Sequence, residues 1–194
     1  AYSPAPRVDA ELHRRIMDEV IHPTVQGRAE EGMPYLGFLY AGLMIDTQGN
    51  PRVLEYNCRF GDPETQPILM RMRSDLAGLC QAALDGELDR FGIEWDPRFA
   101  LGVVMVADGY PGEYPRGDKI SGLQDIRSDN IKVFHAGTRQ ESGQTVTDGG
   151  RVLCVTALGA TVNDAQREAY AAVSTIHWPG AGWRPDIGWR ALNR

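Results

Sequence analysis

The stretch that decides the fold is residues 53–64, which read Val53-Leu54-Glu55-Tyr56-Asn57-Cys58-Arg59-Phe60-Gly61-Asp62-Pro63-Glu64. If residues 53–59 form a strand, successive side chains point to opposite faces of it. Glu55, Asn57 and Arg59 then lie in a row on one face. That face presents a carboxylate, an amide oxygen and a guanidinium within one strand.

This set of side chains has a definite chemical use. Carboxylate and amide oxygens are hard ligands that suit Mg²⁺, an ion that keeps several waters and binds substrate phosphates. A neighbouring Arg can grip a phosphate through two parallel hydrogen bonds. The row therefore predicts a metal- and phosphate-binding face. On spacing alone, a solvated sheet face explains the same pattern, and that interpretation stays open at this point.

The strand is followed by a sharp exit, Gly61-Asp62-Pro63, into a predicted helix. The N–H groups at such a helix start favour an anionic group, whereas Asp62 and Glu64 favour an amine. Arg59 together with these two carboxylates suits a substrate that carries both an amine and a phosphate or carboxylate. The alternative is that Asp62 and Glu64 only form a capping turn.

The predicted strand belongs to a longer β-hairpin that extends toward the N-terminus and covers residues 35–59. A turn centred on Gln48-Gly49 places Gly42 opposite Glu55 and Tyr40 opposite Asn57. A glycine facing the carboxylate would leave room for a nucleotide. A slip of one residue in the pairing would remove this inference.

Helical periodicity predicts helices on either side of the hairpin. Residues 9–31 fit a helix with Asp9 as N-cap, kinked or broken at Pro23. Residues 63–84 fit a second helix, because their apolar residues fall on one face of it. This apolar stripe consists of Ile68, Met72, Leu76, Leu79 and Ala83.

The second half of the chain has a different pattern. Residues 101–107 and 151–158 are apolar, β-branched runs between glycine-rich turns, and Thr161 is a suitable N-cap for a helix to about His177. A charged, proline-containing stretch over 87–97 marks a boundary. The chain is therefore predicted to be an α+β protein, with one part over residues 1–98 and a smaller β-rich part over residues 99–194.

Composition excludes several classes of protein. The formal net charge of −6 argues against nonspecific nucleic-acid binding, which depends on many Lys and Arg contacts to phosphate. No apolar stretch is long enough to span a membrane, and residues 1–6 do not resemble a signal peptide. Cys58, Cys80 and Cys154 are far apart and odd in number, which predicts reduced thiols and a cytoplasmic protein.

Residues 35–72 resemble the last catalytic segment of the glycinamide ribonucleotide synthetase (phosphoribosylamine–glycine ligase) family. The specific match is the run Arg59-Phe60-Gly61-Asp62-Pro63-Glu64-Thr65-Gln66. The resemblance continues through shorter stretches and covers essentially the whole chain: Gly37–Leu43, Ala136–Thr138, Gly149–Leu153 and Asp186–Ala191.

The resemblance implies an ATP-grasp fold, with an antiparallel sheet, flanking helices and a small β-rich C-terminal subdomain. It implies that Glu55 and Asn57 bind the Mg²⁺ or Mn²⁺ that bridges the phosphates of ATP, the co-substrate. Arg59 would contact a phosphate of ATP or of an acyl phosphate. Asp62 and Glu64 would face glycine or 5-phosphoribosylamine. The implied reaction forms glycinamide ribonucleotide, ADP and phosphate in purine biosynthesis.

Members of that family are considerably longer at the N-terminus. We therefore expect this chain to be part of a larger enzyme, inactive without the N-terminal substrate domain and the rest of the ATP clamp. Two alternatives remain. Another ATP-grasp ligase, biotin-carboxylase-like or of the carboxyaminoimidazole type, could share the hairpin, although the Arg59–Gln66 run argues against it. The second alternative is that the chain is a noncatalytic module that binds metal or phosphate.

Overall fold

The structure is a computed structural model that describes residues 1–192 of the 194-residue chain. Its contacts divide the chain into two compact units, each described here by itself. The hairpin unit comprises Ala5–Gly61 and Arg73–Glu94, and the sheet unit comprises Ala1–Pro4, Asp62–Met72 and the chain from Trp95 onward. The predicted domain boundary between residues 98 and 99 stays a prediction.

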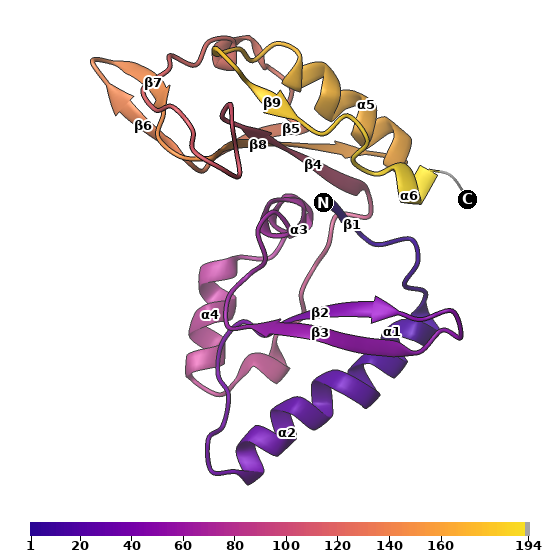
Figure 1. Ribbon diagram of the computed structural model, residues 1–194. Coiled ribbons are helices and arrows are strands. Elements are labelled where there is room, and N and C mark those ends of the chain that lie inside the picture. The colour runs from indigo at the N-terminus through magenta and orange to yellow at the C-terminus, as the bar shows by residue number, and fades with distance from the viewer. Residues whose placement is uncertain (193–194) are drawn as a thin grey trace. The chain divides into compact units, whose positions relative to one another are not determined.

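The hairpin unit consists of helices and a two-stranded antiparallel ribbon (Figure 1). Its elements are α1 (Ala10–Ile16), a π-helical turn (Met17–Ile21), α2 (His22–Glu30), β2 (Tyr40–Ile45), β3 (Pro51–Asn57), α4 (Leu76–Leu84) and a 3-10 turn (Leu88–Arg90). Figure 1 shows α1 and α2 running as one continuous helix.

That helix begins as predicted, because the carboxylate of Asp9 accepts a hydrogen bond from the N–H of Leu12 at 2.8 Å. It does not break at Pro23. The N–H of His22 bonds the carbonyl of Met17, which widens the preceding turn to π-helical geometry. In a regular α-helix the Pro23 ring would press on the carbonyl four residues earlier, and the widened turn removes this conflict.

The predicted pairs are present, with Gly42 opposite Glu55 and Tyr40 opposite Asn57. Nearer the turn the register is shifted by one residue, so that Ile45 lies opposite Pro51. The two strands are shorter than predicted: β2 begins at Tyr40 rather than Tyr35, and β3 ends at Asn57. Residues 33–39, before β2, form an irregular loop instead, in which the Tyr35 hydroxyl donates to the carbonyl of Phe38 at 2.8 Å.

A one-residue bulge interrupts the hairpin next to Glu55. Gly42 pairs with Glu55 but the next residue, Leu43, pairs with Val53, so Leu54 is the extra residue of β3. Bulges bend a strand and change which way its side chains point. The alternation of faces therefore holds from Glu55 to Asn57 and is interrupted before it.

The sheet unit is built on a five-stranded antiparallel sheet with the order β1-β4-β8-β5, to which β9 adds by pairing with β4. Its elements are β1 (Tyr2–Ser3), α3 (Thr65–Arg71), β4 (Phe99–Val106), a 3-10 turn (Leu123–Asp125), β5 (Ile131–His135), β6 (Thr138–Glu141), β7 (Gln144–Thr147), β8 (Arg151–Gly159), α5 (Val162–Val173), β9 (Gly182–Trp183) and α6 (Trp189–Leu192). Strands β6 and β7 form a separate hairpin.

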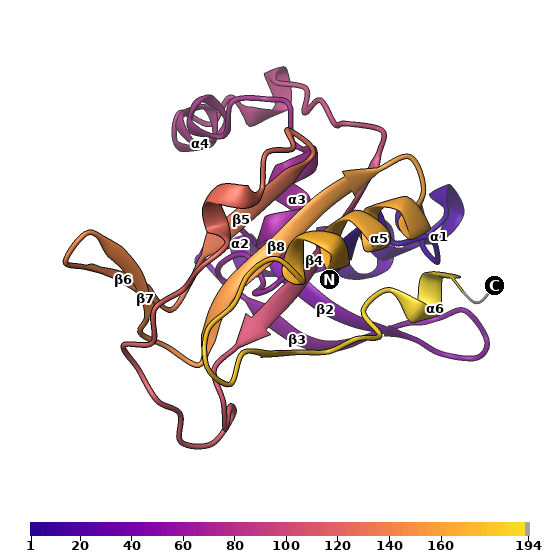
Figure 2. The ribbon, with the colours of Figure 1, turned by 90° about the horizontal axis from the view of Figure 1, so that it is seen from above.

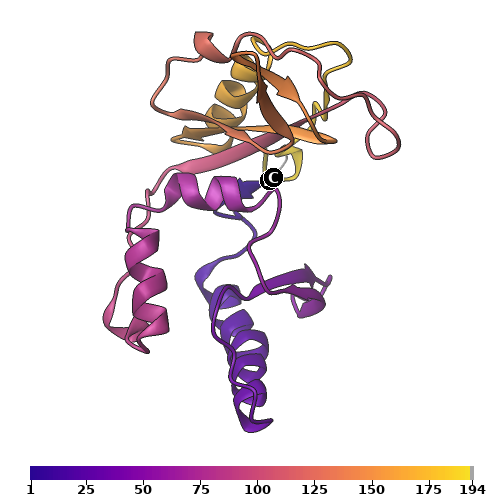
Figure 3. The same ribbon diagram turned by 90° about the vertical axis from the view of Figure 1, so that its left-hand side faces the viewer.

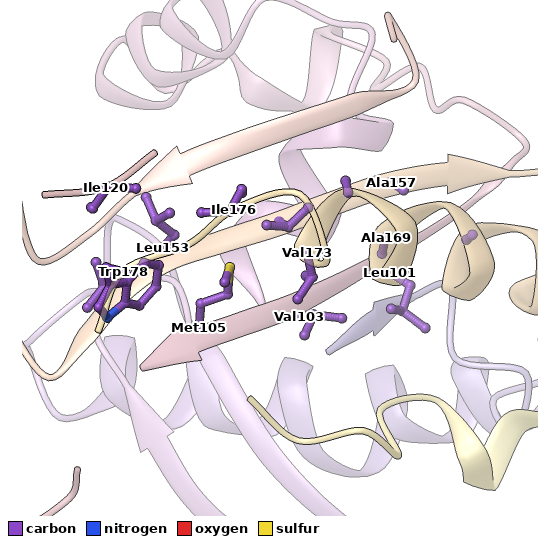
Figure 4. Close-up of a cluster of buried hydrophobic side chains, with 14 of the residues drawn as sticks. Leu101, Val103, Met105, Ile120, Leu153, Ala157, Ala169, Val173, Ile176 and Trp178 are labelled. Carbon is purple, nitrogen blue, oxygen red and sulfur yellow. The ribbon is translucent and has the colours of Figure 1, made fainter. Parts of the chain in front are cut away.

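One face of this sheet is covered by α5, which lies across β4 and β8 (Figure 2). The side chains of Leu101, Val103 and Met105 alternate along β4 toward the helix and are fully buried. They pack with side chains of β8 and α5, among them Leu153 and Val173 (Figure 4). Since burial of each such side chain contributes about 1.5–3 kcal/mol, this layer is the main core of the unit.

Helix α3 packs against the opposite face of the sheet (Figure 3). It can approach closely because Gly102 lacks a side chain: a Cβ there would stand 3.4 Å from Pro67 of α3 and 3.0 Å from the Cys154 sulfur. Cys154 and Thr156 of β8 are buried on this same face of the sheet, next to Gly102. Both faces of β4 and β8 are thus covered, which explains their continuous apolar sequences.

The single helix predicted over residues 63–84 is wrong. Helix α3 ends at Arg71, and the backbone of the next residue, Met72, is extended (φ −71°, ψ 122°). Helix α4 then begins after Asp75, whose carboxylate accepts the N–H groups of Ala77 at 3.2 Å and Gly78 at 3.0 Å. Asp is a preferred N-cap, and local capping here overrides the apolar periodicity.

The helix predicted from Thr161 is confirmed at its start, where the Thr161 hydroxyl accepts the N–H of Asp164 at 3.1 Å. It ends at Val173 rather than near His177. The residues after it pack as an irregular segment, in which Ile176 and Trp178 join the core. Among residues 1–192, no helix combines the length and the apolar character needed to cross a membrane.

Tyr170 of α5 holds the C-terminal segment against the sheet unit. Its hydroxyl donates to the carbonyl of Arg184 at 2.6 Å and accepts the N–H of Ile187 at 3.0 Å. We expect Tyr170→Phe to lower the free energy of unfolding of the sheet unit by roughly 1–3 kcal/mol, since it removes two hydrogen bonds, one of them partly buried. Urea denaturation followed by tryptophan fluorescence measures this. An unchanged midpoint and slope would show that the segment is held by packing alone.

Candidate functional site

The two predicted metal ligands lie side by side on β3. The Nδ2 of Asn57 donates a hydrogen bond to the Oε1 of Glu55 at 3.2 Å, which shows that both side chains stand on one face of the strand. Glu55 is exposed and Asn57 half-buried. The pair is therefore open to a ligand within its own unit.

Gly42 on the neighbouring strand keeps the space beside Glu55 clear. A Cβ at Gly42 would stand 3.0 Å from the Cγ of Glu55, closer than ordinary van der Waals contact. Any larger residue at position 42 would push the Glu55 side chain out of its present position. Gly42 thus lies opposite Glu55 as predicted, and its lack of a side chain allows the Glu55 carboxylate to keep its position.

The hairpin turn behind this pair is fixed by a carboxylate and a guanidinium. Asp46 accepts the N–H groups of Asn50 at 2.8 Å and Gln48 at 2.9 Å. Arg15 of α1 donates to the carbonyl of Gly49 at 3.1 Å. These bonds tie the turn to the helix and so orient the strand that carries Glu55 and Asn57.

The turn should be sensitive to acid through Asp46. The hydrogen bond from the N–H of Asn50 lowers the pKa of the Asp46 carboxyl below its ordinary value. Because the folded pKa is depressed, the carboxylate stabilises the hairpin above the unfolded Asp pKa of about 3.9, and this stabilisation is lost as the pH falls through the folded value.

We therefore expect Asp46→Asn to destabilise the hairpin at pH 7, and the difference from wild type to shrink below about pH 4. Urea titrations followed by the amide NMR signals of β2 and β3 at several pH values measure it. A difference that stays constant down to pH 3 would contradict the assignment to the carboxylate charge.

Arg59 does not stand in the row that the alternation predicts, because β3 ends at Asn57. Its Nη1 donates to the carbonyl of the next residue, Phe60, at 2.8 Å. The Phe60 ring packs against Phe38 with centroids 4.2 Å apart. The structure thus brings Glu55 and Asn57 together and places Arg59 in the segment that follows the strand.

Asp62 and Glu64 belong to the sheet unit. The Oδ2 of Asp62 forms an ion pair with the Nη2 of Arg151 at 3.2 Å, and the Nη1 of Arg151 also donates to the Asp62 carbonyl at 3.1 Å. Glu64 precedes α3, and its carbonyl accepts the N–H of Ile68 at 3.3 Å. Its side chain makes no capping bond.

Sequence reasoning did not link Asp62 to Arg151, which lies 89 positions later in the chain. A single sequence carries no signal for a pair at such separation. Within residues 1–192, no group of three or more His, Cys, Asp or Glu side chains is arranged to hold a metal ion.

Two family models match the chain. Residues 1–65 match the ATP-grasp (A) domain of phosphoribosylglycinamide synthetase, and residues 100–190 match its C domain. The chain is 60% identical over 194 residues to the phosphoribosylamine–glycine ligase of Vibrio parahaemolyticus and 60% identical over 195 residues to that of Escherichia coli K12. Each match covers all of this chain but only 45% and 46% of the relative, so the chain spans less than half of their length.

Solved structures agree with these matches. The phosphoribosylamine–glycine ligase of Thermotoga maritima superposes with a TM-score of 0.77 at 34% identity, over 96% of this chain and 45% of its own. Biotin carboxylase of Campylobacter jejuni superposes with a TM-score of 0.67 at 12% identity, over 100% of this chain and 42% of its own. The second likeness shows a shared fold alone, and together they establish an α+β chain of the ATP-grasp type.

Proposed function

Because the chain belongs to the phosphoribosylglycinamide synthetase family, we propose that it supplies the metal- and substrate-binding part of an ATP-dependent ligase. That ligase joins glycine to 5-phosphoribosylamine and gives glycinamide ribonucleotide in purine biosynthesis. The observation that carries the proposal is the Glu55–Asn57 pair, on one face of a strand with a glycine opposite the carboxylate. Three cysteines without disulfides suit the cytoplasm as the place of this enzyme.

The residues at the pair fit Mg²⁺ or Mn²⁺. Each offers an oxygen, and these ions commonly take one or two protein ligands and complete their shell with water and substrate phosphates. Asn57 presents its Nδ2 to Glu55, so a half-turn of its amide brings Oδ1 to the same side. When bound, the ion would neutralise charge on the ATP phosphates.

The remaining roles follow the chemistry of the reaction. The glycine carboxylate takes the terminal phosphate of ATP, which gives glycyl phosphate and ADP. The amine nitrogen of 5-phosphoribosylamine then bonds to the carbonyl carbon, the bond from that carbon to the phosphate oxygen breaks, and the nitrogen loses a proton. Arg59 would stabilise negative charge on a transferred phosphate, and Asp62 and Glu64 would face the amine-bearing substrates.

A chimaera tests this function directly. This chain replaces the matching 195 residues of the Escherichia coli K12 relative, which is 60% identical to it. We expect the chimaera to release ADP only when both glycine and 5-phosphoribosylamine are present, and to form glycinamide ribonucleotide in equal amount. A folded chimaera that binds ATP but makes no glycinamide ribonucleotide would overturn the proposal in favour of a noncatalytic binding module.

A further inference from the structure

The sheet unit contains a cavity of about 570 Å³ on the face of β4 that does not carry the α5 core. Its volume falls within the range of about 300–1,000 Å³ typical of small-molecule sites. It is lined by Ala1, Pro63, Gly102, Val104, Val106, Tyr110, Pro111, Arg151, Trp183, Arg184 and Ile187. All of these residues belong to one compact unit, so the cavity lies within it.

The floor and the rim of this cavity differ in chemistry. Gly102, Val104 and Val106 alternate along β4 and form an apolar floor. Tyr110 and Trp183 stand at the rim, 39% and 37% exposed. Half-exposed aromatic rings around an apolar floor suit a ligand with an apolar ring face, which packs on them.

The position of Tyr110 is built into the fold. A Cβ at Gly150 would collide with the Tyr110 ring, so the missing side chain lets that ring pack directly on the turn before β8. Gly109, next to it, has φ +81°, and a Cβ there would collide with the carbonyl of Glu113. The loop that brings Tyr110 to the rim therefore depends on glycine at both positions.

A bulge brings Arg151 to the cavity. Met105 pairs with Leu153 but Val106 pairs with Arg151, so Val152 is an extra residue in β8. Without the bulge, Arg151 would share the face of Leu153, which packs in the core. The extra residue turns Arg151 to the opposite face, beside Val106.

Two guanidinium groups line the cavity and keep donors for a ligand. Arg151 makes two bonds to Asp62, and Arg184 makes two to Asp186, at 2.9 and 2.7 Å. Those bonds use two of the five N–H donors of each guanidinium. The other three donors of each guanidinium form no hydrogen bond with the described residues, and Tyr170 holds the backbone of Arg184 in place.

We propose that this cavity binds the phosphorylated sugar substrate, with Arg151 and Arg184 on the phosphate and the ring against Tyr110 and Trp183. The inference rests on the proposed function and assigns it a subsite and two anion-binding residues. Paired guanidinium groups are the usual partners of a phosphomonoester. The carboxylate of Asp62, held at 3.2 Å from Arg151, would accept a hydrogen bond from the amine of the same substrate.

The test uses the 194-residue chain with ribose 5-phosphate as the probe, measured by calorimetry and by NMR. We expect saturable binding of ribose 5-phosphate, with ribose, inorganic phosphate and AMP each binding at least about tenfold more weakly. Arg151→Ala should weaken binding at least about tenfold, since it removes charge-assisted hydrogen bonds. The matched control is Arg167→Ala, an exposed arginine of α5 paired with Asp164, which should leave binding unchanged.

Two further variants guard against misfolding. Val104→Phe keeps Arg151 but fills the floor, and should abolish binding while the near-ultraviolet circular dichroism stays native. Arg151→Lys keeps the charge without the planar fork and should recover only part of the affinity. In the chimaera, Arg151→Ala should raise the KM for 5-phosphoribosylamine about tenfold or more, with the KM for ATP changed less than twofold.

Several results would overturn the proposal. These are no binding of ribose 5-phosphate by the wild-type chain, tighter binding of AMP, or equal losses in Arg151→Ala and Arg167→Ala. The outcome is separable from that of the proposed function. An active chimaera whose KM for 5-phosphoribosylamine is unmoved by Arg151→Ala refutes the subsite alone, whereas an inactive chimaera that still binds ribose 5-phosphate through Arg151 refutes only the ligase assignment.

Discussion

Replacement of Glu55 by Gln in the chimaera is expected to lower the rate of glycinamide ribonucleotide formation by at least about 100-fold. The carboxamide keeps the volume of the side chain and one oxygen but removes the negative charge that a divalent ion needs. Loss of metal-assisted charge stabilisation amounts to several kcal/mol of transition-state energy, and each 1.36 kcal/mol is tenfold in rate. The measurement is steady-state ADP release at several Mg²⁺ concentrations.

A matched control distinguishes the loss of the carboxylate charge at position 55 from the loss of a negative charge elsewhere on the chain. Glu30 lies exposed at the end of α2, where it accepts a hydrogen bond from Gln26 at 2.7 Å. Glu30→Gln should leave both the rate and the Mg²⁺ dependence unchanged. If Glu55→Gln retains more than about a third of the wild-type rate at limiting Mg²⁺, Glu55 is not a metal ligand.

The second large effect concerns the core of the sheet unit. Leu101→Ala should lower the free energy of unfolding by roughly 2–5 kcal/mol, because Leu101 is fully buried and its removal leaves a cavity. Its Cδ1 lies under Gly188, where a Cβ would come within 2.8 Å of it. Urea denaturation, followed by the fluorescence of buried Trp178, reports on this unit.

Leu84→Ala serves as the control for that measurement. Leu84 ends α4 in the hairpin unit and is 68% exposed, so its truncation should change the unfolding of the sheet unit by less than about 0.5 kcal/mol. Equal destabilisation by the two substitutions would mean that Leu101 packs no better than a surface residue.

Local sequence signals predicted much of the fold. Asp9 and Thr161 cap helices where expected. Gly42 lies opposite Glu55 as predicted, although this pairing depends on the bulge at Leu54, which was not predicted. The two caps depend on neighbours in the sequence. The resemblance in residues 59–66 then identified the family, which local physics alone does not name.

The predictions that were wrong or missed concern places where a sequence pattern competes with another interaction in the folded chain. The apolar stripe that runs through Met72 predicted one helix, but the Asp75 cap begins a new one. The face of Arg59 was predicted by extending strand alternation past Asn57, where the strand ends. The Asp62–Arg151 pair requires strands and a helix that come together only in the folded sheet unit.

The extra residue at Val152 has a consequence for chain length. Because it shifts the pairing by one, a deletion of this single codon would restore a regular ladder between β4 and β8. The same deletion would leave Arg151 directly before Leu153 and still beside Val106, but it would remove the side chain of Val152, which is fully buried in the apolar layer, and so leave a cavity there. At this point in the gene, the loss of a codon therefore empties part of the core, whereas the exchange of Val152 for another apolar residue of similar volume keeps the core filled.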